Sequence, residues 1–190
     1  MIQHIKVDLK IVRRGDATGN CFALNDNYYC HFESITLENS EAYIPLLLFF
    51  VQFSPNQFPE ILENALIDIP SYTWPNVLRT HPYLFTKGPC DLDIYGDEYY
   101  GKLLHVNRNE VYVVVAFYDF NEEEVVPLLH FYQVLLLLSE KILELAREYG
   151  TVAYYQKVEP LHYNPKWDQD MERLIGLLRE RIAEESTRDD

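Results

Sequence analysis

One long helix pattern limits the folds open to this chain more than any other feature of the sequence. Residues 127–149 have helical character throughout, with Pro127 acceptable in a first turn and Gly150 placed as a C-terminal stop. Residues 128–138 are apolar on nearly every side, whereas the second half of the segment is charged on one side. A helix that is apolar all round has to be covered from several directions. The chain therefore needs layers of other elements around this helix.

A second helix pattern follows near the C-terminus, where Asn164 and Pro165 are typical of a helix start. Its apolar residues recur at steps of three and four, which predicts one amphipathic stripe. The members of that stripe are Trp167, Met171, Leu174, Leu178 and Ile182. Between the two helices, residues 151–159 are predicted to form a last strand.

Strand patterns dominate the first part of the chain. Residues 5–11 alternate between apolar and charged side chains, as in a half-buried strand. Two hairpins are expected, one around residues 25–27 and one around residues 107–109. Their arms are residues 21–24, 28–37, 99–106 and 110–119.

An apolar run at residues 46–53 has Gln52 as its polar exception. Such a run suits a central strand that is covered on both faces, with a buried helix as the alternative. Short helices are expected at residues 60–68 and 74–80, where prolines supply start and stop signals.

Together these elements predict a single α+β domain over residues 1–190. In this fold a mostly antiparallel sheet of about five to seven strands is covered by the two long C-terminal helices. Residues 1–120 are expected to be mainly β with short helices, and residues 121–190 mainly helical with one strand. The apolar strands and the apolar helix carry more apolar surface than these helices can cover. A homodimer interface is one way to bury the remaining apolar surface.

The balance of charge limits the ligands that the chain can bind. Acidic side chains outnumber basic ones by 30 to 16, which gives a formal net charge of −14. No basic block is large enough to bind nucleic acid as the main ligand. The charge either keeps an apolar chain soluble or attracts a basic partner, chiefly by raising the on-rate. Because the apolar run at residues 125–138 is short and interrupted, no membrane span is expected.

Cysteine usage indicates a reducing compartment. Cys21, Cys30 and Cys90 form no CxxC pair, and the chain shows no secretory signal. A two-residue turn at residues 25–26 would set Cys21 opposite Cys30, whereas a slip of one residue would put them on opposite faces. We therefore expect free thiols and a cytoplasmic location.

Acids before the second hairpin resemble the start of a calcium loop, with Asp91 and Asp93 at its first and third positions. The pattern fails at its fifth position, Tyr95, and at its twelfth, Lys102. Asp91, Asp93 and Glu110 could instead converge as the metal site of a small hydrolase or nuclease. We expect no metal or cofactor and keep this enzyme as an alternative function.

Arginines 13 and 14 with Gly15 and the nearby Gly19 could hold an anion through backbone N–H groups. The segment lacks the GK[ST] sequence that makes a phosphate loop specific. A plain surface loop is therefore expected here.

Paired tyrosines are the most informative oddity of the sequence, and each pair lies in a predicted strand. Because neighbouring strand residues face opposite sides, each pair sends one ring inward and one outward. Outward rings on adjacent strands would form an aromatic patch of the kind that is enriched at binding hot spots, unless a helix covers them. The acidic run 122–124 precedes the long helix. Its negative charge could stabilise the helix N-terminus or bind basic side chains of a partner. The predicted partner-binding residues are Tyr28, Tyr29, Tyr99, Tyr100, Tyr154, Tyr155, Asp97, Glu98, Glu122, Glu123 and Glu124.

The expected function is that of a small acidic cytoplasmic module that binds a basic protein and inhibits or scaffolds it. Immunity proteins, antitoxins and phage-encoded inhibitors share this charge and size, which is an analogy and not a family assignment. A structural subunit of a larger assembly is a further alternative.

Overall fold

The computed structural model describes most of the chain, with gaps. The described residues are 5–18, 21–37, 46–47, 50, 53–66, 85–87, 100–105, 110–117, 120–160 and 163–187. The predicted helix at residues 74–80 lies outside these ranges. Among the described residues, no helix combines the length and the hydropathy that crossing a membrane requires.

The N-terminal sheet contains three antiparallel strands in the order β1-β3-β2. These are β1 (Ile5–Arg13), β2 (Cys21–Ala23) and β3 (Tyr28–Leu37). The predicted strand and the predicted first hairpin are confirmed. The hairpin register pairs Cys21 with His31 and Phe22 with Cys30, so the two cysteines occupy neighbouring positions with opposite faces. Both are free thiols, as expected.

A second sheet contains four antiparallel strands in the order β4-β5-β6-β7. These are β4 (Phe85–Lys87), β5 (Tyr100–His105), β6 (Glu110–Phe117) and β7 (Phe120–Pro127). The predicted hairpin between β5 and β6 is confirmed. Residues 122–124, expected as an acidic run before the long helix, belong to β7 and pair with Val113, Val114 and Val115 of β6. Pairing with this apolar strand overrides the weak β preference of glutamate.

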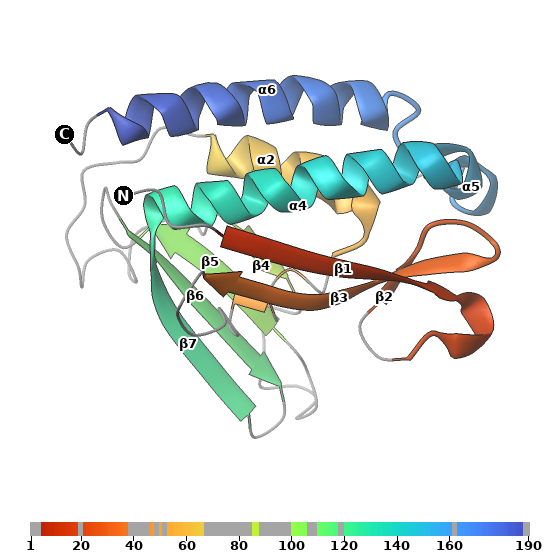
Figure 1. The fold of residues 1–190 in the computed structure, drawn as a ribbon, viewed down its shortest axis with the longest axis horizontal. Coiled ribbons are helices and arrows are strands. Elements are labelled where there is room, and N and C mark those ends of the chain that lie inside the picture. Colours follow the sequence, from red (N-terminus) through yellow and green to blue (C-terminus); the bar gives the residue numbers. More distant parts are fainter. Residues whose placement is uncertain are drawn as a thin grey trace.

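The helices form layers over the N-terminal sheet (Figure 1). Helix α4 (Leu128–Tyr149) lies between β1 and α6 (Trp167–Ser186). Helix α6 packs mainly on α4 and on α2 (Phe58–Ala65), which follows the short helix η2 (Pro55–Gln57). Helix α4 ends at Tyr149 as predicted and is followed by Gly150, whose φ of 69° is left-handed. It starts one residue later than predicted, because Pro127 is the last residue of β7.

Two predicted strands are wrong. The segment at 151–159 forms helix α5 (Thr151–Val158), in which Thr151 and Tyr155, four residues apart, are buried on the same face. In the apolar run at 46–53, the described residues Leu46, Leu47 and Phe50 are helical. This agrees with the buried helix that was the alternative to a strand. In both places the apolar content was right and the periodicity was not distinctive enough to separate helix from strand.

The α+β class with antiparallel strands is confirmed. One sheet of about five to seven strands is not confirmed, because the described strands form two sheets. The two long C-terminal helices also do not cover the sheet equally. Helix α4 packs on β1, whereas α6 packs on the far side of α4.

Aromatic side chains fill the core between these layers. The rings of Phe50 and Phe131 stack with centroids 6.4 Å apart, and Phe58 stacks on Phe50 at 6.3 Å. Four residues of the predicted α6 stripe, Trp167, Met171, Leu174 and Leu178, are buried, and Ile182 packs against the same cluster. The core thus joins α2, α4 and α6 to the N-terminal sheet.

Candidate functional site at the hairpin end

Several elements meet at one end of the N-terminal sheet, which we call the hairpin end. It comprises the β2–β3 turn at residues 25–27, the short helix η1 (Arg14–Asp16) after β1, the last turn of α4 and helix α5. In Figure 1 the β2–β3 turn and α5 lie at the same end of the molecule. The main chain of Arg14 donates a 2.9 Å hydrogen bond to the carbonyl oxygen of Asn27, which fixes η1 to the turn.

The side chain of Asn25 joins the hairpin turn to helix α4. Its Oδ1 accepts hydrogen bonds from the main-chain N–H groups of Asn27 and Tyr28, at 2.9 and 3.0 Å. Its Nδ2 donates a 3.0 Å hydrogen bond to the carbonyl oxygen of Tyr149. That carbonyl lies in the last turn of α4 and has no partner within the helix, so Asn25 satisfies it. Asn25 therefore both stabilises the β2–β3 turn and attaches that turn to the end of helix α4.

Replacing Asn25 with alanine is expected to lower the free energy of unfolding by about 2–3 kcal/mol, because three hydrogen bonds are lost together. Urea unfolding followed by circular dichroism measures this change. The matched control is Asn27→Ala, since the Asn27 side chain makes no hydrogen bond within the described part of the chain. Equal losses for the two variants would contradict the assigned role of Asn25.

Tyrosine rings gather at the hairpin end. Tyr28 and Tyr29 are neighbours on β3, and the ring of Tyr28 lies 5.2 Å from that of Tyr149. Tyr154 of α5 lies close enough to Tyr29, Arg14 and Asp26 for their charges to affect it. Burial, followed by Tyr29 and Asp26, raises the pKa of Tyr154, so its hydroxyl is protonated at neutral pH. The rings of Tyr28, Tyr29 and Tyr154 are all partly exposed.

A ladder of buried rings supports Tyr154 from behind. Tyr155 lies 5.1 Å from the ring of Tyr154 and stacks on Tyr163, also at 5.1 Å. Tyr163 in turn lies 6.4 Å from Trp167 at the start of α6. Burial is the main cause that raises the pKa of Tyr155. These contacts hold α5 to the start of α6.

The structure brings together part of the predicted partner-binding set. Tyr29, Tyr154 and Tyr155 lie close together at the hairpin end, although the last two lie on a helix and not on a strand. Tyr28 lies on the opposite face of β3 from Tyr29 and contacts the ring of Tyr149. Adjacent helical residues point about 100° apart, so Tyr155 is buried while Tyr154 stays partly exposed. The other described members lie on the second sheet: Tyr100 on β5, and Glu122, Glu123 and Glu124 on β7. Asp97, Glu98 and Tyr99 lie outside the described residues.

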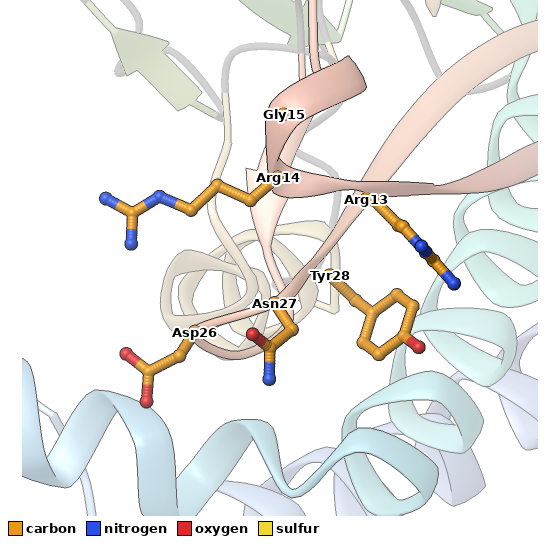
Figure 2. A pocket seen from close by; sticks show the side chains of 6 residues that line it. All are labelled: Arg13, Arg14, Gly15, Asp26, Asn27 and Tyr28. Carbon is orange, nitrogen blue, oxygen red and sulfur yellow. The ribbon is translucent and has the colours of Figure 1, made fainter.

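A cavity of about 380 Å³ opens at the hairpin end (Figure 2). Its lining residues are Arg13, Arg14, Gly15, Asp26, Asn27 and Tyr28. Arg13 and Tyr28 are cross-strand partners and extend to the same side, whereas Arg14 and Asp26 extend to the other (Figure 2). Lys157 of α5 lies 3.5 Å from the Asp26 carboxylate. The segment that was expected to be a plain surface loop thus forms one wall of a cavity.

The predicted acidic metal site is only partly described. Glu110 begins β6 opposite Pro127, whereas Asp91 and Asp93 lie outside the described residues. Across the ranges that the structure describes, no group of three or more His, Cys, Asp or Glu residues could hold a metal ion. Burial raises the pKa of the Cys30 thiol to about 12, with a smaller contribution from Cys21. The hydrolase alternative remains a prediction.

Comparisons with protein-family models, with curated proteins and with solved structures found no match for this chain. Its function has to be inferred from the residues of the hairpin end. These offer a set of partly exposed tyrosine rings and a cavity whose lining includes two arginines.

Proposed function

We propose that the chain acts as one α+β domain that binds a basic protein partner and inhibits or scaffolds it, with the hairpin end as the contact surface. The observation that carries this proposal is the meeting of Tyr29 of β3 with Tyr154 of α5, two partly exposed tyrosines from separate elements. Tyrosine gives a large contact area at a small entropic cost and is enriched among residues that dominate binding energy.

The supporting elements hold these rings in place before a partner arrives. Asn25 fixes the turn that precedes Tyr28, and the buried ring of Tyr155 fixes the helix that carries Tyr154. Side chains that are already ordered lose less entropy on binding. A preorganised surface of this kind favours a specific contact.

Charge supplies the second part of the proposal. The net charge of −14 attracts a basic protein at long range, and the carboxylates of Asp26 and Glu159 act on Tyr154 at close range. Charges around the edge of an interface act mostly on the association rate, which falls as salt screens them. We therefore propose that the tyrosine rings supply most of the binding affinity and that the acidic side chains raise the association rate.

A reducing, cytoplasmic setting fits the same proposal. Cys21 and Cys30 are free and lie on opposite faces of the hairpin, so they cannot pair with each other in this fold. Free thiols persist where the compartment is reducing.

The proposal is tested by capturing the partner and then truncating one ring. Proteins bound to the tagged chain in cells that produce it are identified, and the binding kinetics of the purified basic partner are measured by surface plasmon resonance. Tyr154→Ala is expected to weaken binding about thirtyfold, mainly through faster dissociation. Raising the salt concentration is expected to slow association of the unmodified chain.

Leu177→Ala is the matched control, because Leu177 is a large apolar residue that is 42% exposed on α6. It is expected to leave both rate constants unchanged. An equal loss for Leu177→Ala and Tyr154→Ala would overturn the assignment of the hairpin end. An association rate that does not respond to salt would overturn the role of charge.

A further inference from the structure

Strand β7 is the least protected sheet edge in the described part of the chain. The four edge strands there are β1, β2, β4 and β7. Strands β2 and β4 contain three residues each, and such short edges offer little backbone to another strand. Strand β1 contains nine residues, but it carries Lys6 and Lys10 and has a register shift between Asp8 and Leu9. Lysines and bulges on an edge both hinder the addition of a further strand.

Strand β7 lacks these features over most of its length. Its eight residues pair with β6 in a continuous register, and none of them is a lysine. Alternate residues of an antiparallel strand direct their N–H and C=O groups to the same side. Strand β7 therefore keeps a row of backbone hydrogen-bonding groups on the side away from β6, where Figure 1 shows no other described strand or helix. Protection comes only at its last residue, Pro127, which has no N–H group.

The acidic run 122–124 selects the kind of strand that can be added. If β7 paired with β7 of a second copy at full overlap, Phe120 would face Pro127 and Glu123 would face Glu124. Like charges opposite each other on two strands are destabilising, whereas opposite charges are stabilising. The run therefore disfavours a second copy and favours an incoming strand that carries Lys or Arg. Val125 is 49% exposed, and strand alternation places Glu123 on the same face, so an apolar residue two positions from a basic one would match this edge.

We propose that the free edge of β7 binds an extended, lysine- or arginine-rich segment of another protein by strand addition. In this mode main-chain hydrogen bonds supply the affinity, and side chains at alternate positions supply the specificity. The net charge of −14 raises the association rate with such a segment. The inference goes beyond the proposed function, because it assigns a second contact surface on the other sheet and uses none of the tyrosines at the hairpin end.

Fluorescence anisotropy of a labelled peptide of alternating lysine and valine, titrated with the full chain at low ionic strength, tests the proposal. Saturable binding is expected, and a peptide with glutamate in place of lysine is expected not to bind. A peptide with the same lysines and an N-methylated main chain keeps the charge but donates no main-chain hydrogen bond. It is expected to bind at least about tenfold more weakly. In hydrogen exchange followed by nuclear magnetic resonance, the β7 amides that point away from β6 are expected to exchange more slowly in the complex.

Glu123→Lys is expected to weaken binding of the lysine–valine peptide about tenfold. The matched control is Glu180→Lys, because Glu180 is an exposed residue of α6 and its replacement changes the net charge by the same amount. This control is expected to weaken binding less than about twofold. Absence of saturable binding, equal weakening by the two variants, or equally tight binding of the N-methylated peptide would overturn the proposal.

Two further results separate this edge from its alternatives. A dimer of the chain alone, in which the outer β7 amides are protected from exchange, would assign the edge to a second copy and overturn the basic partner. Tyr154→Ala is expected to leave peptide binding unchanged, and an equal loss for Tyr154→Ala and Glu123→Lys would overturn the placement of the peptide on β7. A chain that binds no peptide but loses its protein partner on Tyr154→Ala would contradict this inference and leave the proposed function standing.

Discussion

Replacing Trp167 with alanine is expected to lower the free energy of unfolding by about 3–5 kcal/mol. Trp167 begins α6 and is among the largest fully buried side chains. Its indole Nε1 donates a 2.7 Å hydrogen bond to the carbonyl oxygen of Pro55 in η2. Alanine would leave both a cavity and a buried carbonyl without its partner, and the two costs add.

Urea unfolding followed by circular dichroism measures the loss, and Trp167→Phe separates its two causes. Phenylalanine keeps most of the apolar volume but donates no hydrogen bond, so a smaller loss of about 1–3 kcal/mol is expected. Leu177→Ala, also on α6 but exposed, is expected to change stability by less than about 0.5 kcal/mol. If Trp167→Ala unfolded at the same urea concentration as Leu177→Ala, the contact between α6 and η2 would not stabilise the fold.

Phe131→Ala is expected to cost a similar amount, about 3–5 kcal/mol, for a different reason. Phe131 is fully buried in the apolar half of α4, and its ring stacks almost parallel to that of Phe50, with an angle of 9°. Phe50 stacks in turn on Phe58 of α2. Truncating Phe131 therefore removes one end of a stack that joins three helical segments.

The same unfolding experiment with Phe131→Leu gives the comparison. Leucine fills much of the space without a flat face, so the expected cost is about 1–2 kcal/mol. A Phe131→Ala variant as stable as Phe131→Leu would show that the neighbouring side chains collapse into the space. That outcome would contradict the close packing assigned to the apolar half of α4.

Elements with a long, uninterrupted pattern were predictable from the sequence. Helix α4 is 22 residues long, which is longer than most strands, and Pro127 and Gly150 flank it at its two ends. Helix α6 shows a regular stripe, and β1 alternates between apolar and charged side chains over residues 5–11. In each case the spacing of apolar residues and the local end signals agree, so tertiary contacts had nothing to override.

Helix α5 could not be predicted in the same way. Its eight residues include Thr151, Val152, Tyr154 and Tyr155, which are β-branched or aromatic and favour strands. A segment so short gains little from helix propensity and takes its conformation from its contacts. Those contacts are the burial of Thr151 and the stacking of Tyr155 on Tyr163, and neither can be read from the local sequence.

The cavity depends on register and was missed for that reason. The adjacent arginines were visible in the sequence, but their relation to Tyr28 follows from the pairing of Arg13 with that residue in β1 and β3. A shift of one residue would place Arg13 on the other face of the sheet. The tyrosine set shows the opposite case, since the composition was informative while the expected strand at Tyr154 was wrong.

The order in which the layers are joined has a consequence for the growing chain. Strands β1 and β3 are complete at residue 37, but α4, the helix that packs on β1, spans residues 128–149. Val7, Phe32 and Ile35 share one buried cluster with α4, so they have no such cover until the ribosome has released that helix. If β1 and β3 pair before α4 has been synthesised, their apolar face is open to self-association, and α4 removes that risk when it packs on β1.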